Sequence, residues 1–499
     1  MISTRTRLGI EVLAAGLALG LVGDTLLRAM PWGLNVTLCA AALVGAGLVL
    51  VRRHHLTAGP DTPWLAITVL LLGAAFMRRD SEALAQFDVI GLLIALSLGA
   101  ASLHGERIAA LRPLAYLQTG VLTAANTIAG GFLLVGQDVR WEELPREGRL
   151  RHVRAVGLGV LLAAPLLAVF GSLFASADSV FGTVLTNLFA FDAGAVASHT
   201  FFIGFWAALT AGYLRWCLVA RPPSTTQPTA ETARGLGIVP VGTALGLINL
   251  LFLLFVVVQV RYFFGGAALV QQTTGLTYAE YARHGFFELV TASGLVLPVL
   301  LGADHLVRGE TAAHLATFRR LAGLLLVLLA VIMASALERM RLYVAAFGLS
   351  EDRLYATAFM IYLLGVFAWL GWTVLRGRRQ RFAFGALVQG FAVLTGLHVL
   401  NPDAFIVRTN LTRPAAERPF DAKYAISLGA DAVLPLLDAL PTLGTQEGCA
   451  VARGLLNRWD VDAADWRTWN WSRSRARRLV RERATDLRAL PCPPSKEPS

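Results

Sequence analysis

The stretch LLFLLFVVVQVRYFFGG, residues 250–266, determines the fold class of this chain. It begins as a fully apolar run and ends on the polar residues Gln259 and Arg261. The chain enters its next apolar run through TYAEYARHGFFELV, residues 277–290, where Glu288 lies about one turn inside the apolar segment. Because about 20 apolar residues cross a bilayer, we expect two membrane helices joined by a polar, aromatic connection.

The composition of the whole chain indicates a membrane protein. Of its 499 residues, 56% are hydrophobic and only 15% are charged, whereas soluble domains carry about 25% charged residues. Gly and Ala are frequent inside the apolar runs, as helix packing in membranes favours. The net charge is +11, but the arginines are scattered between apolar runs, which argues against nucleic-acid binding and fits membrane topology.

The apolar runs predict an all-α, polytopic membrane helix bundle of about 11 spans, with 12 as the alternative. The N-terminal run has a basic start and an apolar core, and we interpret it as an uncleaved first span. The predicted spans are residues 8–30, 33–51, 62–77, 84–103, 153–175, 198–219, 237–262, 285–307, 318–338, 353–376 and 382–400.

Segment 113–136 leaves the number of spans open. It carries no charge, so it could cross the membrane, but its polar and small residues fall on one helical face, as in a helix packed in a bundle or lying in the interface. The positive-inside rule favours eleven spans without it, because most arginines then lie in inner segments. This topology places the N-terminus inside the cell and the C-terminus outside.

Composition divides the chain into two membrane blocks and a C-terminal helical domain. The motif NPD at 401–403 predicts a helix start, and helices are expected at about 421–440, 446–458 and 465–489. The predicted divisions are an N-terminal membrane block at 1–220, a flexible inner loop at 221–236, a second membrane block at 237–400, a small soluble helical domain at 401–490 and a disordered tail at 491–499.

Ten polar residues near span ends form a candidate polar network on the predicted outer side of the membrane. Ionisable residues at a membrane boundary favour a functional interpretation, a ligand or substrate site. The alternative is a structural network, in which acids and arginines pair and hold helix ends to the C-terminal domain. The ten residues are Asp178, Gln259, Arg261, Tyr281, Arg283, Glu288, Arg341, Tyr343, Arg353 and Arg408.

Glu288 is the most informative member of this set. An unpaired carboxylate inside an apolar helix is costly, so we expect it to be protonated or to pair with Arg261, Arg283 or Arg341. Three further acids lie in apolar runs near span ends, where we expect them to be solvated or paired: Glu11, Asp24 and Asp88.

The four cysteines fall into two pairs. Cys39 and Cys217 lie in apolar runs and are expected to be packing residues. Cys449 and Cys492 lie in the C-terminal domain, and if that domain is outside, its compartment favours disulfides. We therefore predict a Cys449–Cys492 bridge, worth about 3–4 kcal/mol in the chain-entropy model.

The sequence contains none of the common signatures of catalytic or metal sites. It has no HExxH, no Walker loop and no GxSxG elbow, and its histidines and cysteines show no ligand spacing. We therefore expect no cofactor and no metal, and we favour a protein that is not an enzyme.

Several motifs together resemble a bacterial membrane family, labelled domain of unknown function 4173, with its sibling 4153. The resemblance covers most of the chain and implies a polytopic membrane protein, without an established activity. The motifs are FASADSVF (174–181), LLFVVVQVRYFFGG (253–266), TYAEYARHGFFEL (277–289), RMRLYVAAFGLSEDRLYATAFM (339–360), NPDAFIVRTNLTR (401–413) and a C-terminal WRTWNWSRSRAR.

Three functions stay open at this point. The first is a non-enzymatic envelope sensor or scaffold that works through its outer face in the bacterial inner membrane. The second is a transporter with a path near Glu288 and Gln259. The third is a lipid-linked glycosyltransferase-like enzyme. The expected partners are the lipid bilayer and a membrane or envelope protein, with no nucleic acid.

Overall fold

The structure is a computed structural model of the chain. It describes residues 3–143, 193–220, 237–274, 286–307, 311–413, 420–462 and 465–492, together with Phe170, Phe174 and Asp178. Every regular element in these ranges is helical, and ten helices are long and apolar enough to cross a membrane. The chain is thus an all-α, multi-pass membrane protein.

The chain folds into two compact units. Unit 1 comprises residues 1–30, 38–58 and 120–221, and unit 2 comprises residues 31–37, 59–119 and 222–499. Segment 59–119 therefore packs with the second half of the chain, although composition alone had grouped it with the N-terminal block. The packing contacts that hold it there are described below.

In unit 1, the helices cross closely where small residues meet. Helix α1 (Thr4–Leu27) packs along α8 (Ala193–Leu218), and a Cβ on Gly16 would lie 2.6 Å from the Cβ of Ala211. The C-terminal end of α5 (Pro113–Leu133) approaches α8 just as closely, at Gly130 of α5 and Gly212 of α8. The remaining elements are the larger part of α2 (Leu34–Arg53), η2 (Leu134–Asp138) and η3 (Trp141–Glu143).

Unit 2 contains the other membrane helices and all the C-terminal helices. Its membrane helices are α4 (Glu82–Leu103), α9 (Ile238–Thr274), α11 (Phe286–Leu306), α12 (Ala312–Phe347), α13 (Glu351–Thr373) and α14 (Phe382–Leu400). A shorter apolar helix, α3 (Thr62–Arg78), packs on α4. Two short elements, η1 (Ile108–Ala110) and η4 (Arg379–Arg381), pack on each other.

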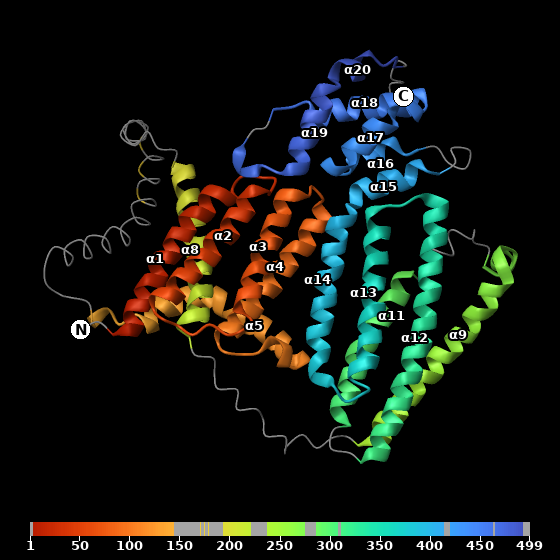
Figure 1. The fold of residues 1–499 in the computed structure, drawn as a ribbon, viewed down its shortest axis with the longest axis horizontal. Coiled ribbons are helices and arrows are strands. Elements are labelled where there is room, and N and C mark those ends of the chain that lie inside the picture. Colours follow the sequence, from red (N-terminus) through yellow and green to blue (C-terminus); the bar gives the residue numbers. More distant parts are fainter. Residues whose placement is uncertain are drawn as a thin grey trace. The chain divides into compact units, whose positions relative to one another are not determined.

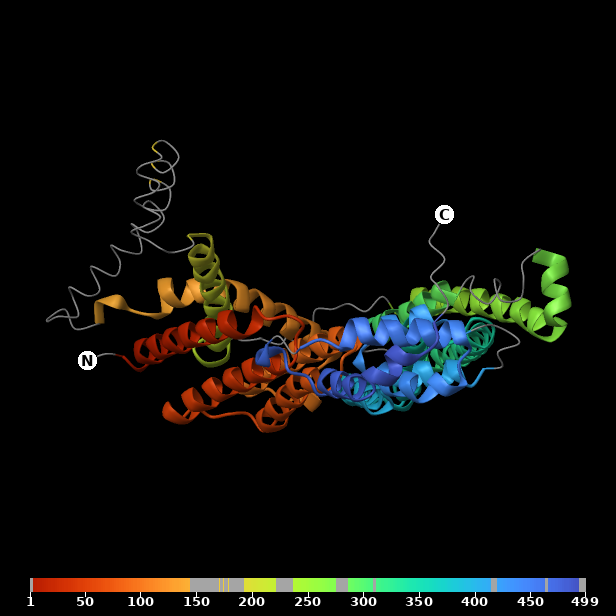
Figure 2. The same cartoon turned by 90° about the horizontal axis from the view of Figure 1, so that it is seen from above.

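The C-terminal helices of unit 2 lie at one end of α12, α13 and α14 (Figure 1). Seen from above, they cover the ends of these helices (Figure 2), and α15 packs on both α13 and α14. They are α15 (Pro402–Leu411), α16 (Ala422–Ser427), η5 (Ala430–Ala432), α17 (Val433–Ala439), η6 (Leu440–Thr442), α18 (Thr445–Trp459), η7 (Trp466–Thr468), α19 (Trp471–Glu482) and α20 (Ala484–Ala489).

Two large apolar cores stabilise unit 2, beside a smaller cluster of Leu65, Leu98, Ala101 and Ile108. One lies among the membrane helices and centres on buried side chains of α12 and α13, including Phe318 and Met360. The other lies among the C-terminal helices and includes Ile406, Val451 and Val480. Because the second core is its own cluster, the C-terminal helices form a packed body that is attached to the membrane helices.

The structure describes three of the predicted segments to different extents. Residues 113–136 form a helix whose described extent, Pro113–Asp138, is long and apolar enough to cross a membrane, so length and composition allow the span that the arginine distribution had set aside. The predicted span 153–175 and the predicted inner loop 221–236 lie outside the described residues, apart from Phe170 and Phe174.

Candidate functional site

The connection between α3 and α4, residues 79–81, is held by the C-terminal helices. Arg79 donates from Nη1 to Asp431 Oδ1 at 2.9 Å, and from Nε and Nη2 to the carbonyl oxygen of His398 at 3.0 and 2.7 Å. Its side chain is only 13% exposed. Arg79 thereby joins α3, the end of α14 and η5.

Asp80 makes the second set of contacts from this connection. Its Oδ1 accepts from Arg473 Nη1 at 2.8 Å, and its Oδ2 accepts from the amide of Ala430 at 3.1 Å. The carbonyl oxygen of Asp80 lies so close to Gly429 that a Cβ there would approach it to 1.7 Å. Only glycine fits at 429, because any side chain would displace the connection.

Asp431 is the acceptor at the centre of this junction. Besides Arg79, it accepts hydrogen bonds from Asn401 Nδ2 at 3.0 Å, Ser472 Oγ at 2.8 Å and the amide of Asp80 at 3.3 Å. Asn401 ends α14 with a left-handed φ of 59°, a conformation that Asn adopts more readily than most residues. Three segments that are far apart in sequence, at residues 79–80, 401 and 472, therefore share one carboxylate.

Side chains at residues 470–472, where α19 begins, donate hydrogen bonds to the last carbonyl groups of α3. The last carbonyl groups of a helix have no partner within it. Asn470 Nδ2 donates to the carbonyls of Phe76 and Arg79, both at 2.8 Å, and Ser472 Oγ donates to the carbonyl of Arg78 at 2.8 Å. Asn470 Oδ1 also caps α19 by accepting from the amide of Arg473 at 3.0 Å.

Arg473 extends the junction to the connection between α1 and α2. It donates from Nη2 to the carbonyl of Trp32 at 2.8 Å, and the amide of Leu34 donates to the carbonyl of Trp469 at 2.9 Å. Burial lowers the pKa of Arg473, and the charge of Asp80 opposes that shift. A buried guanidinium with a carboxylate partner is costly to disrupt.

The connection between α12 and α13 contacts α15. Asn410 Oδ1 accepts from the amide of Leu349 at 2.7 Å, and its Nδ2 donates to the carbonyl of Leu349 at 2.8 Å. Gly348 adopts a φ of 85° at the end of α12. Within unit 2, four helix ends or connections of the membrane helices thus contact the C-terminal helices at the same end. They are residues 31–34, 76–81, 348–349 and 398–401.

Asp403 is the most buried acid of this junction and is 1% exposed. Its Oδ2 accepts from the amide of Gly429 at 2.9 Å, and its Oδ1 has no hydrogen-bond partner among the described residues. Burial raises its pKa to about 8, and the nearby charges of Glu351 and Asp431 add to the shift. At neutral pH the Asp403 carboxyl therefore carries a proton.

Asp88 and His398 form a second buried contact directly below the junction. Asp88 Oδ1 and His398 Nε2 are 2.9 Å apart; the Asp88 side chain is buried and that of His398 is partly buried. Beside them is an apolar cavity of about 350 Å³ between α4, α13 and α14, with Phe87 and Tyr355 among its lining residues. Tyr355 also hydrogen-bonds Ser81 at 3.1 Å.

The acids predicted to be paired near span ends do have partners. Glu11 contacts Arg7, Arg53 and His54, and Asp24 contacts Arg28 and His199, in both cases within unit 1. Together with the Asp88–His398 contact, these pairs show that all three acids are paired, one of the two outcomes expected for them.

The predicted polar network and the junction consist of different residues. Arg353 donates to the carbonyl of Gly348 and lies over the Tyr343 ring, with its guanidinium 4.1 Å from the ring centre. Arg341 pairs with Glu338 on its own helix at 2.6 Å. Arg408 is exposed on α15. These contacts lie at the same end of unit 2 as the junction but are not part of it.

The structure describes the side chains of only some of the other members of the predicted network. Gln259 is 8% exposed, and its Oε1 has no partner among the described residues. Glu288 is exposed near the start of α11, and Asp178 belongs to unit 1. The side chains of Arg261, Tyr281 and Arg283 lie outside the described ones, so the expected pairing of Glu288 stays a prediction.

The cysteines lie as the sequence analysis expected. Cys449 and Cys492 form a disulfide with a Cα–Cα distance of 5.5 Å, while Cys39 and Cys217 are free. The bridge joins the first turn of α18 to the segment after α20. It closes the C-terminal body on itself without contributing to the junction.

Sequence reasoning missed the junction residues, although two signals were present. The polar sequence Arg78-Arg79-Asp80-Ser81 separates two apolar runs, and NPD at 401–403 directly follows the last span. The first was interpreted only as a topology marker and the second only as a helix start. Their pairing depends on Arg473, which lies in the WRTWNWSRSRAR motif but was not considered as a site residue, and on Asp431, which lies in none of the quoted motifs.

The chemistry available at the junction is hydrogen bonding, ion pairing and the binding of one proton by Asp403. Among the described residues, no group of three His, Cys, Asp or Glu side chains is placed to hold a metal ion. The junction is therefore best described as a polar connection between the membrane helices and the C-terminal helices.

Comparison with known proteins gives one result. No curated protein and no solved structure matches the chain. The family model described as domain of unknown function (DUF4153) matches residues 66–439, a region that includes Arg79, Asp403 and Asp431. Of the two sibling families that the motifs resemble, this match shows 4153, and the resemblance to 4173 is not confirmed. The chain belongs to the family described as domain of unknown function 4153.

Proposed function

We propose that this protein is a non-enzymatic sensor or scaffold of the bacterial inner membrane that works through its outer face. The observation that carries this proposal is the junction centred on Asp431. It fixes the C-terminal helices to several connections of the membrane helices, so a partner bound to these helices would act directly on the membrane part. A rigid link of this kind suits signalling or assembly.

The orientation of the chain is part of the proposal. The connections that meet the C-terminal helices are the ones that the arginine distribution assigns to the outer side, and the basic connection 376–381 lies at the other end of unit 2. This agreement supports a C-terminus outside. Reporter fusions after Arg381 and after residue 420 should read inner and outer compartments, respectively, and a cytoplasmic signal at 420 would overturn the orientation.

The partner surface that we favour lies on the C-terminal helices. Trp466 and Trp471 are largely exposed beside the segment that contacts the end of α3. Tryptophan is enriched at the membrane–water interface and among the residues that dominate protein interfaces. We propose that these side chains contact the lipid surface or a membrane partner.

A genetic experiment tests the proposed function. A deletion strain would be complemented with wild type, with the junction variant Arg79→Gln, and with the control Arg453→Gln, which removes an exposed charge on α18. Envelope integrity should fail in the deletion strain and in the junction variant at equal protein level, and recover with the control. Full recovery with the junction variant would contradict a role for the junction.

The transporter alternative rests on one observation, the buried Gln259 side chain. A buried polar atom without a partner is unusual and would suit a path through the membrane helices. Solute profiling of the same strains separates the two functions, because a transporter predicts a defect in one solute that Gln259→Leu reproduces. Altered lipid-linked sugars in the deletion strain would favour the glycosyltransferase-like alternative.

A further inference from the structure

The connection between α13 and α14 forms a basic hollow at the end of unit 2 opposite the C-terminal helices. Gly377 adopts a φ of 78°, and this turn exposes the arginines that follow it. The hollow has a volume of about 520 Å³, and none of its described lining residues is acidic. They are Gly377, Arg378, Arg379, Gln380 and Arg381.

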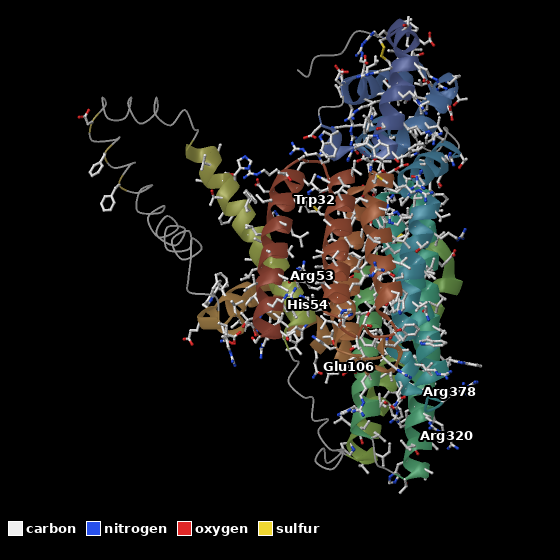
Figure 3. The ribbon with its side chains drawn as sticks, turned by 60° about the vertical axis from the view of Figure 1, so that its left-hand side comes forward. Trp32, Arg53, His54, Glu106, Arg320 and Arg378 are labelled. Atoms are coloured by element: carbon white, nitrogen blue, oxygen red, sulfur yellow. A yellow bond between two sulfur atoms is a disulfide. The ribbon has the colours of Figure 1, made fainter. Side chains whose placement is uncertain are left out.

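A neighbouring helix adds to the positive charge of this hollow. Arg319 of α12 reaches the turn, since its Nη2 lies 3.7 Å from the position that a Cβ on Gly377 would take. Figure 3 shows Arg320 and Arg378 at the same end of the membrane helices. Arg379 is the one lining arginine with a described carboxylate partner, Asp304 of α11, at 2.8 Å.

The hollow lies at the depth of lipid headgroups. The spans Glu351–Thr373 and Arg379–Leu400 are separated by only a few residues, so their connection cannot extend far from the bilayer surface. Trp372 at the end of the first span is 51% exposed, and the Arg376 guanidinium lies 3.9 Å from the centre of its ring. An exposed tryptophan beside arginines is typical of the membrane–water interface.

We infer that this hollow binds the phosphate group of an anionic phospholipid in the adjacent leaflet. Arg378 and Arg381 from the connection, with Arg319 from α12, would donate to the phosphate oxygens. Guanidinium groups match phosphate geometry and bind it in a bidentate manner, and basic pockets between membrane helices are known to hold lipid headgroups. The lipid is the fitting occupant because the acyl chains of a molecule bound at this depth stay in the bilayer.

The hollow is independent of the junction, so the inference does not rest on the proposed function. Arg319, Arg378 and Arg381 have no carboxylate partner among the described residues and are exposed, so replacing them changes the charge without opening a core. By contrast, the arginines of the junction are buried and paired with carboxylates. The exposed set can therefore bind an external anion.

Lipid titration of the purified, delipidated full chain in neutral detergent tests the inference. The thermal unfolding midpoint would be followed against phosphatidylglycerol, phosphatidylcholine and inorganic phosphate, for wild type and for the variant Arg319→Gln/Arg378→Gln/Arg381→Gln. The control is Lys423→Gln/Arg453→Gln/Arg475→Gln, which removes the same charge from the exposed surface of the C-terminal helices.

We expect phosphatidylglycerol to raise the midpoint of wild type and control, and phosphatidylcholine to have no such effect. The hollow variant should need at least about tenfold more phosphatidylglycerol, since each arginine near an anionic surface contributes about a fivefold gain. Equal titrations for the variant and wild type would overturn the site. If inorganic phosphate alone reproduced the rise, a free anion would replace the lipid and the inference would fail.

Discussion

The two ends of the membrane helices in unit 2 use arginine in opposite ways. At the end that carries the C-terminal helices, Arg79 and Arg473 are buried and each contacts a carboxylate at 2.8–2.9 Å. At the other end, Arg378 and Arg381 are exposed around a hollow. The same residue type therefore fixes protein segments where acids surround it and is free to bind an external anion where they do not.

Among substitutions at the two ends, Asp431→Ala should cause the largest loss in the free energy of unfolding. This change leaves Arg79 and Asn401 without their shared acceptor, and removing one partner of a buried ion pair costs about 3–5 kcal/mol. Denaturant titration of the purified protein measures the loss in the free energy of unfolding. A loss below about 1 kcal/mol would mean that the junction does not hold the C-terminal helices.

The disulfide is the next test, because it stabilises the C-terminal helices without touching the junction. Cys449→Ser should lower the free energy of unfolding of these helices by about 3–4 kcal/mol, mainly through the unfolded state. Cys492→Ser should give the same loss, and the double variant should lose no more than either single variant. Additive losses would show that the two cysteines act separately.

Asp403 should make the stability of the junction depend on pH. Its pKa is about 8 in the folded protein, against an ordinary value of 3.8 for an aspartate carboxyl group, so between these values the folded state holds a proton that the unfolded state has lost. Stability should therefore fall as pH rises from about 4 to about 8 and then level off. Wild type should lose several degrees of unfolding midpoint across this window.

The variant Asp403→Asn is the control for this pH dependence. The amide resembles the protonated acid in shape and keeps an oxygen for the amide of Gly429, the donor that Asp403 accepts from at 2.9 Å. We expect a flatter pH profile and a higher unfolding midpoint than wild type above pH 8. An unchanged slope would assign the pH dependence to other groups.

The smallest change in the free energy of unfolding is expected at the end of unit 2 that carries the basic hollow. Arg378→Gln removes an exposed side chain that lines the hollow, and such surface changes usually alter the free energy of unfolding by at most about 0.5 kcal/mol. The same titration used for Asp431→Ala gives this value directly. A loss as large as that of Asp431→Ala would remove the contrast between the two ends.

The membrane helices were predictable from the sequence because a bilayer requires long apolar runs. The C-terminal helices were predicted less accurately, since two expected helices are interrupted. The helix expected at 421–440 breaks near Gly429, where the Asp80 carbonyl approaches, and the helix expected at 465–489 breaks near Asn470, which donates to the end of α3. Both breaks arise from contacts with residues about 350–400 positions away, which local patterns do not encode.

The candidate site was harder to predict than the fold. The depth of Glu288 in an apolar run drew attention to it, but its side chain is exposed. The acids of the junction, Asp80, Asp403 and Asp431, lie outside the predicted spans. Asp403 and Asp431 become important only when the C-terminal helices close over residues 79–81. Such pairing across the chain depends on the tertiary structure.

The contact between Arg79 and Asp431 tests the central claim, that the α3–α4 connection holds the C-terminal helices to the membrane helices. A double-mutant cycle with Arg79→Gln and Asp431→Asn isolates the interaction of these two side chains. We predict a coupling of at least about 1.5 kcal/mol in the free energy of unfolding, within the range of directly contacting residues. Additivity within about 0.5 kcal/mol would show that the two side chains do not interact energetically and would contradict the account.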